Sequence, residues 1–276
     1  MKQLLKIMIP FIMFSFGQDV ASQSMKIISF NIRYNSWNNI DGPNGWPNRR
    51  AAVVKMIKKE KPAAIGLQEP LIDQLQYLDS CLPTYRRIGV GRDDGEEAGE
   101  FMAIYYDTTV LELTDSALLW LSETPEVPSK GWDAACYRTL TKATFRHRKS
   151  GKQFVYFNTH LDHVGKTARE ESMKYIASII ESDCSDIPVI VGGDMNTTSK
   201  DSIFQSLYNC GLRSARKVAR RTSNKNTYNG FGKDKPSLID YLFVRGIKVK
   251  RFRTLNGNYG VPYISDHYPI EIKISL

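Results

Sequence analysis

Short apolar runs that end in polar or turn residues recur along the whole chain, and they constrain its fold more than any other feature. They are rich in β-branched and aromatic residues, which favours strands. Apolar residues at helical spacing lie between only some of these runs. This irregular alternation indicates two packed sheets flanked by helices, because a parallel doubly wound sheet would need a more regular order. Strands are predicted over residues 25–30, 64–67, 101–106, 139–145, 154–159, 189–191, 239–244 and 270–274, and helices over residues 49–59, 71–78, 166–182 and 202–208.

The first residues of the chain differ in character from the rest. Lys2 and Lys6 precede an apolar run over residues 7–16, and small residues follow up to Ser22. This layout predicts a signal peptide over residues 1–22 and export to the periplasm or the extracellular space. A buried N-terminal helix is the alternative. The apolar run is shorter than the roughly 20 residues of a membrane span, so we expect no stable membrane insertion.

The rest of the chain has the features of one domain. No internal repeat, low-complexity tract or Gly/Ser linker interrupts residues 25–276, so we expect a single domain and a monomer. The cysteines Cys81, Cys136, Cys184 and Cys210 are widely spaced and form no CxxC metal motif. In an exported chain they can be bridged or free, and both alternatives stay open.

Basic residues exceed acidic ones and give the chain a formal charge of +9. Lys and Arg concentrate over residues 213–221 and 248–253. One interpretation is a solvated face that keeps the protein soluble. The other is attraction to a phosphorylated or polyanionic substrate. Charge alone does not distinguish the two.

Polar residues that can bind a ligand or take part in catalysis stand at the ends of the predicted strands. Strand ends are where a rigid scaffold presents side chains to solvent, so these positions are candidates for a functional site. They are Asn31, Glu69, His160 and Asp194, each after a strand, and Asp266 and His267 before the last strand.

The segment Gly192-Gly193-Asp194-Met195-Asn196 follows an apolar strand. Its glycines permit a tight turn and the close approach of a ligand. Asp194 could orient a water molecule or bind a metal ion, and Asn196 could donate to a phosphate oxygen. The alternative is an ordinary turn with Asx capping.

Two further segments carry charged or titratable groups. A carboxylate directly after a buried strand, as at Glu69, is costly unless it is paired or bound to metal, and Mg²⁺ favours a few carboxylate oxygens. An acid at a helix N-terminus is the alternative for Glu69. His160, Asp162 and His163 cluster within a few residues, which favours a functional role over a structural one.

The pair Asp266-His267 precedes the last predicted strand. Neighbours in an extended chain point to opposite faces, so another acid is the expected partner of His267, and Asp240 is the candidate. No HExxH motif, GxSxG motif or P-loop occurs. Zinc, a serine nucleophile and a Walker-type phosphate site are therefore disfavoured.

Taken in order, six segments resemble the endonuclease/exonuclease/phosphatase superfamily, and the likeness spans almost the whole chain after residue 25. That superfamily includes pancreatic-type deoxyribonuclease, apurinic-site endonuclease, sphingomyelinases, inositol-polyphosphate 5-phosphatases and the deadenylase/nocturnin group. The loops of this chain resemble a secreted bacterial subgroup. The six segments are Ser29-Phe30-Asn31, Leu67-Gln68-Glu69, Thr159-His160-Leu161, Gly193-Asp194-Met195-Asn196, Ile239-Asp240-Tyr241 and Ser265-Asp266-His267.

The resemblance implies a four-layered α/β sandwich, in which two mixed, mainly antiparallel sheets are flanked by helices. It implies Mg²⁺, with Mn²⁺ as a substitute, held by Glu69 with Asn31 beside it and Asp266 as a further acid. The apurinic-site branch has an acid two residues after the strand-end Asn, where this chain has Arg33. That departure favours one metal ion over two.

The resemblance also implies roles for the remaining residues. The catalytic set is His160, which binds phosphate or the leaving group, Asp194 and Asn196, which orient the nucleophile, and His267 with its partner Asp240. Glu100 matches an acid that supports His160 in the deoxyribonuclease branch, and Arg138 matches an arginine that binds the substrate phosphate.

These roles together predict hydrolysis of a phosphodiester by in-line attack of an activated water. The basic charge and tryptophans such as Trp132, which could stack a base or sugar, favour a nuclease or nucleotide phosphodiesterase. Tryptophans that only fix loops to the core are the alternative interpretation. A phosphatase or phosphodiesterase acting on a small molecule or a lipid headgroup is the alternative function.

Overall fold

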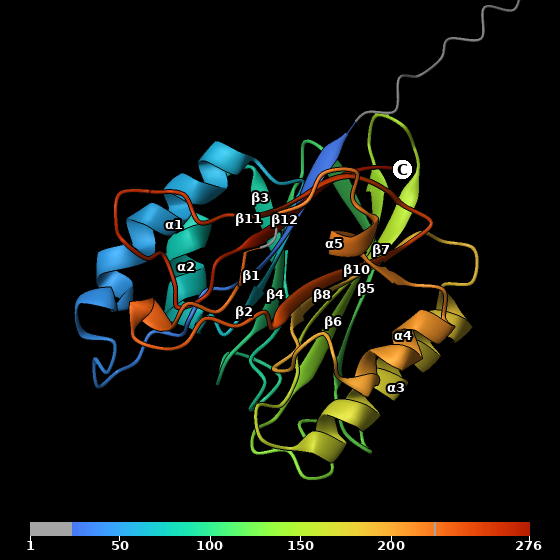
Figure 1. Ribbon diagram of the computed structural model, residues 1–276, viewed down its shortest axis with the longest axis horizontal. Coiled ribbons are helices and arrows are strands. Elements are labelled where there is room, and N and C mark those ends of the chain that lie inside the picture. Colours follow the sequence, from blue (N-terminus) through green and yellow to red (C-terminus); the bar gives the residue numbers. More distant parts are fainter. Residues whose placement is uncertain (1–23, 224) are drawn as a thin grey trace, which may run out of the picture.

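The computed structural model describes residues 24–223 and 225–276 and shows two six-stranded sheets packed face to face (Figure 1). In each sheet one central pair is parallel, and the other pairs are antiparallel. The first sheet has the order β11 (Lys248–Thr254), β12 (Ile270–Ser275), β1 (Met25–Asn31), β2 (Ala64–Gln68), β4 (Met102–Asp107) and β3 (Tyr85–Ile88). The second has the order β5 (Leu111–Trp120), β6 (Thr139–His147), β7 (Gln153–His160), β8 (Val189–Asp194), β10 (Asp240–Arg245) and β9 (Arg213–Ser214).

Helices cover the outer face of each sheet. In Figure 1, α1 (Trp46–Glu60) and α2 (Ile72–Cys81) lie on the left, and α3 (Lys166–Asp183) and α4 (Gln205–Asn209) lie on the right. The predicted four-layered α/β sandwich is confirmed. Shorter elements are α5 (Ala215–Val218) and the 3₁₀ turns η1 (Gly42–Asn44), η2 (Ser202–Phe204) and η3 (Gly230–Gly232).

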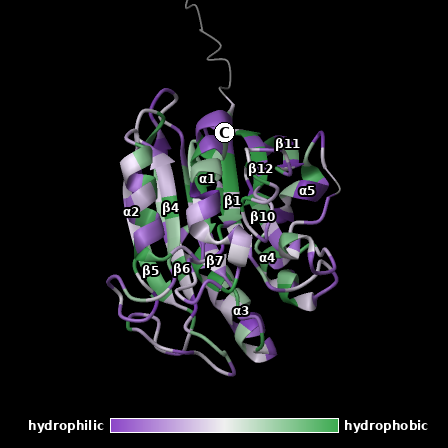
Figure 2. Cartoon of the chain, turned by 90° about the vertical axis from the view of Figure 1, so that its left-hand side faces the viewer, coloured by the Kyte–Doolittle hydropathy of each residue, from purple (hydrophilic) through white to green (hydrophobic). Residues whose placement is uncertain are grey.

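The central strands bury apolar side chains on both faces. In β7, Val155 and Phe157 pack against α3, whereas Phe154 and Tyr156 pack between the sheets. A strand that is covered on both faces reads as a continuous apolar run, which explains why these strands were recognisable in the sequence. Figure 2 colours β1 and β12 as hydrophobic, and most residues of both strands are buried.

A buried polar network also joins the two sheets. The Asn158 side-chain amide donates to the carbonyl oxygens of Leu67 and Ala103 at 2.9 and 3.0 Å. Its oxygen accepts from Gln68 Nε2 at 2.6 Å, and the Tyr156 hydroxyl donates to the Ile28 carbonyl at 2.9 Å. Because buried polar groups are costly when unpaired, these bonds fix how the sheets face each other.

Three further predictions concern the signal peptide, membrane insertion and the cysteines. The predicted signal peptide lies outside the described residues. Within the described part of the chain, no helix is long and apolar enough to cross a membrane. The four cysteines carry free thiols, which favours the unbridged alternative.

Candidate active site

Strand register brings three of the predicted residues together. His160 ends β7, Asp194 ends β8, and Asp240 begins β10. Asp194 is the register partner of His160 in the parallel β7–β8 pair and of Asp240 in the antiparallel β8–β10 pair. Residues far apart in sequence therefore form one row across three adjacent strands.

Asn31 connects this row to the first sheet. It ends β1, and its side-chain amide donates to Glu69 Oε1 at 2.8 Å and to Asp194 Oδ2 at 3.1 Å. Glu69 directly follows β2 and has a φ of 70°, an uncommon conformation for a residue other than glycine. Its second carboxylate oxygen accepts from the backbone amide of Tyr34. Two carboxylates from different sheets are thus held by one buried amide.

His267 lies between two acids. Its Nδ1 is 2.9 Å from Asp240 Oδ2, the pairing expected from the sequence, and its Nε2 is 3.6 Å from Asp194 Oδ2. Burial alone would lower the pKa of His267, but Asp240 and Asp194 outweigh it and raise that pKa well above the usual value. Burial and the neighbouring Asp240 raise the pKa of Asp194 to about 7.

His160 contacts Asn196 rather than an acid of the 91–101 loop. Its Nε2 lies 2.9 Å from Asn196 Nδ2, and its buried Nδ1 has no partner among the described residues. Burial and the nearby Arg138 guanidinium lower the pKa of His160 well below its usual value. The expectation that Glu100 supports His160 is wrong. Glu100 pairs with Arg92 at 2.6 Å, because a charged guanidinium binds a carboxylate more strongly than a neutral imidazole does.

The two glycines before Asp194 serve a different purpose from the one expected. Both lie inside β8 and not in a turn. A side chain at Gly192 would meet Leu242 Cδ2 at 2.7 Å, and one at Gly193, where φ is +155°, would meet the Thr159 carbonyl oxygen at 1.9 Å. Their role is the close packing of neighbouring strands. Asp194 does accept from the backbone amide of Asn196, as an Asx turn requires.

Asp266 and Arg33 lie on the far side of Glu69. Asp266 is half-buried, and burial together with the nearby Glu69 raises its pKa. Arg33 binds Asp41 through two hydrogen bonds of 3.1 and 3.2 Å, and its Nε is 3.9 Å from Asp266 Oδ2. A guanidinium, and not an acid, therefore stands two residues after Asn31 and beside Asp266.

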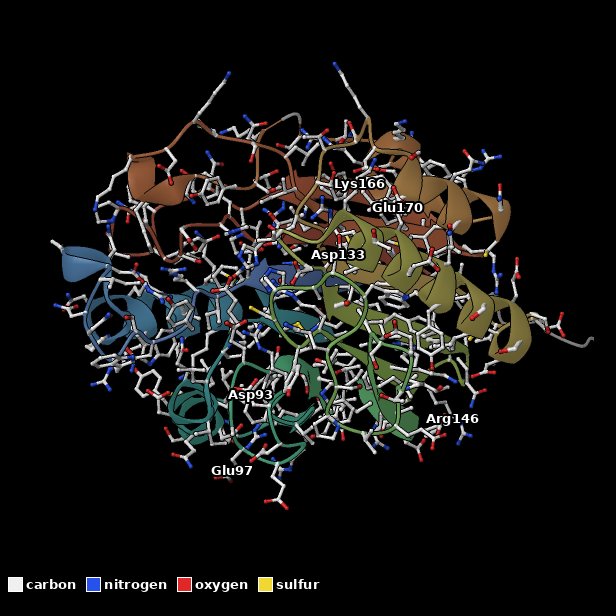
Figure 3. The ribbon with its side chains drawn as sticks, turned by 90° about the horizontal axis from the view of Figure 1, so that it is seen from below. Asp93, Glu97, Asp133, Arg146, Lys166 and Glu170 are labelled. Carbon is white, nitrogen blue, oxygen red and sulfur yellow. The ribbon has the colours of Figure 1, made fainter. Side chains whose placement is uncertain are left out.

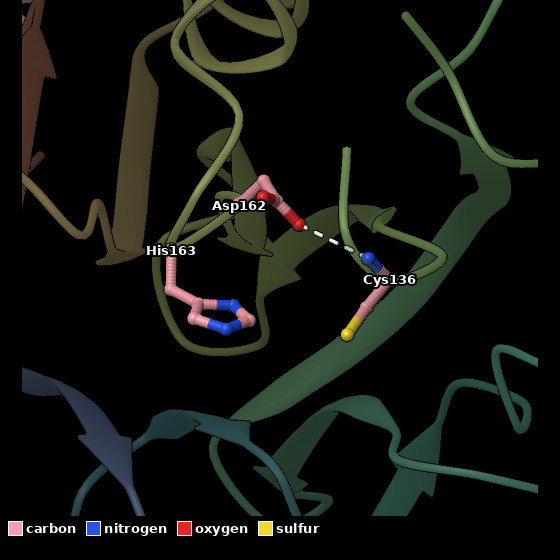
Figure 4. Close-up of side chains that lie close together, drawn as sticks. All are labelled: Cys136, Asp162 and His163. Carbon is pink, nitrogen blue, oxygen red and sulfur yellow. Dashed lines mark hydrogen bonds between the residues drawn. The ribbon is translucent and has the colours of Figure 1, made fainter. Parts of the chain in front are cut away.

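Arg138 is held in a cradle of polar groups at the start of β6. Its Nε donates to Asp162 Oδ2 at 3.1 Å, and its Nη2 lies 2.9 Å from His163 Nδ1. Cys136, Asp162 and His163 have the spacing of a metal site (Figure 4). However, the Arg138 guanidinium already binds Asp162 and His163, and Asp162 also accepts the backbone amides of Cys136, Val164 and Gly165. The cluster is a guanidinium cradle. It leaves the buried Arg138 Nη1 unpaired.

These groups surround a cleft of about 610 Å³. Asn31 and Asp240 are buried behind its wall, whereas the predicted substrate-binding residue Trp132 is half-buried and does not line it. Of the other tryptophans, Trp120 is buried and donates to the Arg92 carbonyl, so it fixes the loop that carries Arg92. The predicted residues that line the cleft are Glu69, Glu100, Arg138, His160, Asp194, Asn196, Asp266 and His267.

Sequence reasoning did not assign several lining residues to the site. Arg92 and Tyr228 lie in loops without periodicity, so no sequence signal indicated them. His163 was indicated only by its clustering with His160. The residues not assigned are Arg33, Tyr34, Arg92, Cys136, His163, Tyr228, Ser237 and Ile239.

Charge is distributed unevenly over the molecule. The cleft opens where β1, β7 and β8 end, and Figure 3 views this end, with Asp93, Glu97 and Asp133 among the labelled side chains. Asp93, Asp94, Glu96 and Glu97 are all exposed. A basic surface lies at the opposite end, because Lys248 pairs with Ser275 at the far end of β12. That surface consists of Arg220, Arg221, Lys248, Lys250, Arg251 and Lys273.

Comparison with known proteins agrees with this geometry. Residues 28–267 match the endonuclease/exonuclease/phosphatase family. The chain belongs to this family. Its members are phosphoester hydrolases, since each of the three activities in the family's description cleaves a phosphoester bond.

Similar proteins cover most of this chain. A solved family member from Bacteroides vulgatus is 34% identical, with a TM-score of 0.87 over 92% of this chain and 99% of that one. A mannosyl-6-phosphatase from Bacteroides thetaiotaomicron is 31% identical, with a TM-score of 0.85 over 91% of this chain and 100% of that one. An uncharacterised protein of Acanthamoeba polyphaga mimivirus is 27% identical, over 90% of this chain and 99% of that protein.

Proposed function

We propose that the protein is a divalent-metal-dependent phosphoesterase that acts on a small phosphorylated molecule, by in-line attack of an activated water. The observation that carries this proposal is the convergence of Glu69, Asn31, Asp194 and the His267–Asp240 pair in one cleft. These are the groups that hydrolysis of a phosphoester needs, namely a cation site, a base and hydrogen-bond donors.

The residues around Glu69 fit a hard cation. Glu69 and Asp266 offer carboxylate oxygens on one side of the cleft, and Asn31 holds Glu69 in place. Mg²⁺ favours a few carboxylate oxygens, and Mn²⁺ is the natural substitute. When bound, the ion would act as a Lewis acid on a phosphoryl oxygen. Arg33, beside Asp266, supports one ion rather than two.

Asp194 is the proposed base. Hydrogen bonds from Asn31 and from the backbone amide of Asn196 fix its carboxylate, so one face is directed toward the cleft. As the water oxygen forms its bond to phosphorus, its proton passes to Asp194; the bond to the leaving oxygen breaks, and that oxygen takes a proton from solvent. His267, kept protonated by its two acids, stabilises the negative charge that develops on the phosphoryl oxygens.

Three observations support a small substrate. The basic surface, which would attract a long polyanion, lies at the opposite end of the sheets from the cleft, and exposed acids stand in the loop that carries Arg92. Trp132 does not line the cleft. A relative at 31% identity is named for phosphatase activity on a mannosyl 6-phosphate. A nuclease remains the second candidate, because Trp37 is 95% exposed and could stack a base.

The test is a substrate panel with purified protein. Mannose 6-phosphate, glucose 6-phosphate, single- and double-stranded DNA and RNA are incubated with Mg²⁺, with Mn²⁺ and with EDTA. We expect phosphate release from a sugar phosphate, stimulated by the metal ions and abolished by EDTA. Cleavage of nucleic acid alone would favour the nuclease, and no hydrolysis of any substrate would refute the enzymatic proposal.

A further inference from the structure

We propose that a side pocket next to the cleft binds the hydroxyl-rich leaving group of the substrate, a single sugar ring. This inference rests on the function proposed above, since it concerns the other half of the same substrate. The side pocket measures about 230 Å³. Its lining residues are Arg33, Ile40, Asp41, Tyr228, Gly230, Phe231, Lys233, Asp234 and Asp266.

The side pocket adjoins the catalytic cleft. Arg33, Tyr228 and Asp266 line both cavities. A phosphoester held at Glu69 and Asp194 can therefore extend its leaving group past Asp266 into the side pocket. The volume is below the roughly 300 Å³ at which pockets for drug-sized ligands begin, so it takes one ring rather than an extended chain.

The walls of the side pocket are fixed before any ligand arrives. On one side the two hydrogen bonds between Arg33 and Asp41 close the 33–41 loop. On the other, the Asp266 carbonyl accepts the backbone amides of Asn229 and Gly230 at 2.7 and 3.1 Å. This second wall is therefore attached to a residue of the catalytic cleft.

Phe231 is held in an unusual conformation at the turn of η3. Its φ is 54°, which residues other than glycine seldom adopt, and its backbone amide donates to Asn229 Oδ1. A strained backbone persists only where its surroundings hold it, and such positions cluster at ligand sites. Here the strain keeps an aromatic ring at the wall of the side pocket.

The charges of the side pocket favour a neutral polar group over a second phosphate. Two cations, Arg33 and Lys233, stand among three carboxylates, those of Asp41, Asp234 and Asp266. Asp266 is also a proposed ligand of the metal ion, so the charges left to the side pocket are two cations and two carboxylates, and a formal balance of zero gives no net attraction for the next phosphate of a nucleic acid. Donors and acceptors side by side match hydroxyl groups, each of which is both. The rings of Tyr228 and Phe231 can cover the apolar face of a sugar.

The test compares two substrates that share the phosphate and differ in the leaving group. Mannose 6-phosphate can fill the side pocket, whereas methyl phosphate cannot reach it. In Phe231→Asn and Lys233→Met we expect the ratio of kcat/KM for mannose 6-phosphate to that for methyl phosphate to fall about tenfold or more. Asn tolerates the positive φ of position 231, and Met retains the length of Lys233, so the fold is preserved.

The control is Lys235→Met, an exposed lysine that directly follows Asp234 but does not line the side pocket, and its ratio should equal that of the wild type. An unchanged ratio in both pocket variants, or cleavage of DNA but not of mannose 6-phosphate by the wild type, would overturn the inference. If the wild type hydrolyses neither ester nor any nucleic acid, it is the proposed function that fails.

Discussion

Neighbouring residues hold the side chains of this site firmly in place. Asp194 receives hydrogen bonds from Asn31 and Asn196 and faces two imidazoles, so its direction is fixed before substrate binds. Arg138 is held by Asp162 and His163, which leaves one buried nitrogen unpaired at the cleft. Pre-organisation of this kind lowers the cost of ordering side chains during catalysis.

The contact between Arg138 and His163 gives the first prediction. His163→Ala removes the acceptor of the Arg138 guanidinium, so KM for the phosphorylated substrate should rise about tenfold, the worth of one hydrogen bond to a charged group. His163→Asn places an oxygen near the Nδ1 position and should restore most of the affinity. Steady-state kinetics on the three proteins measure both effects.

His147 supplies the control for this prediction, because it lies at the other end of β6 from the cleft. His147→Ala should leave KM unchanged. Equal KM values for His163→Ala and His163→Asn would show that His163 does not act by positioning Arg138.

Elements of secondary structure differed in how well the sequence predicted them. All eight predicted strands are present, because both faces of these strands are buried and their sequences are apolar. The four strands that sequence patterns did not reveal, β3, β5, β9 and β11, are the edge strands of the two sheets. Edge strands carry charge against aggregation, as in Tyr85–Ile88 and Lys248–Thr254, and this disrupts the apolar pattern.

Only the site residues that lie at or next to strand ends could be predicted from the sequence. Residues that end or begin central strands were found, and register explains why they meet. Groups from loops, such as Arg92, were not found, because a loop's path depends on contacts distant in sequence. The partner of Glu100 was assigned wrongly for a different reason: Arg92 lies only eight residues away in the same loop, but no periodic pattern links the two residues.

The packing of β7 against β8 gives a prediction about stability. Gly193→Ala places a methyl group 1.9 Å from the Thr159 carbonyl in a strained backbone, so the free energy of unfolding should fall by about 2–4 kcal/mol. Gly151→Ala is the control, because Gly151 also has a positive φ, of 70°, but nothing lies within 4 Å. It should lose only about 1 kcal/mol. Urea unfolding measures both, and equal losses would argue against strand packing as the cause.

Charge is distributed unevenly over the whole molecule. Four carboxylates and three arginines line the cleft and exposed acids stand in the 91–101 loop, whereas all the charged residues that line the basic surface at the far end of the sheets are cations. The net charge of +9 therefore does not describe the surroundings of the cleft. This is why overall charge favoured a nuclease, whereas the local arrangement favours a small substrate and a bound cation.

Because carboxylates crowd together in the cleft, we predict that a divalent cation stabilises the whole fold. Mg²⁺ bound near Glu69 and Asp266 should raise the melting temperature, since a ligand at 100 times its Kd contributes about 2.7 kcal/mol. Glu69→Gln should abolish the shift, whereas Glu97→Gln, an exposed acid outside the cleft, should retain it. A melting temperature that is the same with Mg²⁺ and with EDTA would contradict a resident metal site.

The most direct test of the account is the rate of phosphate release by Asp194→Asn with saturating Mg²⁺. The exchange preserves the shape of the side chain and removes the base, so turnover should fall about 10³-fold or more while the melting temperature stays close to that of the wild type. A variant within tenfold of the wild-type rate would show that Asp194 does not activate the attacking water.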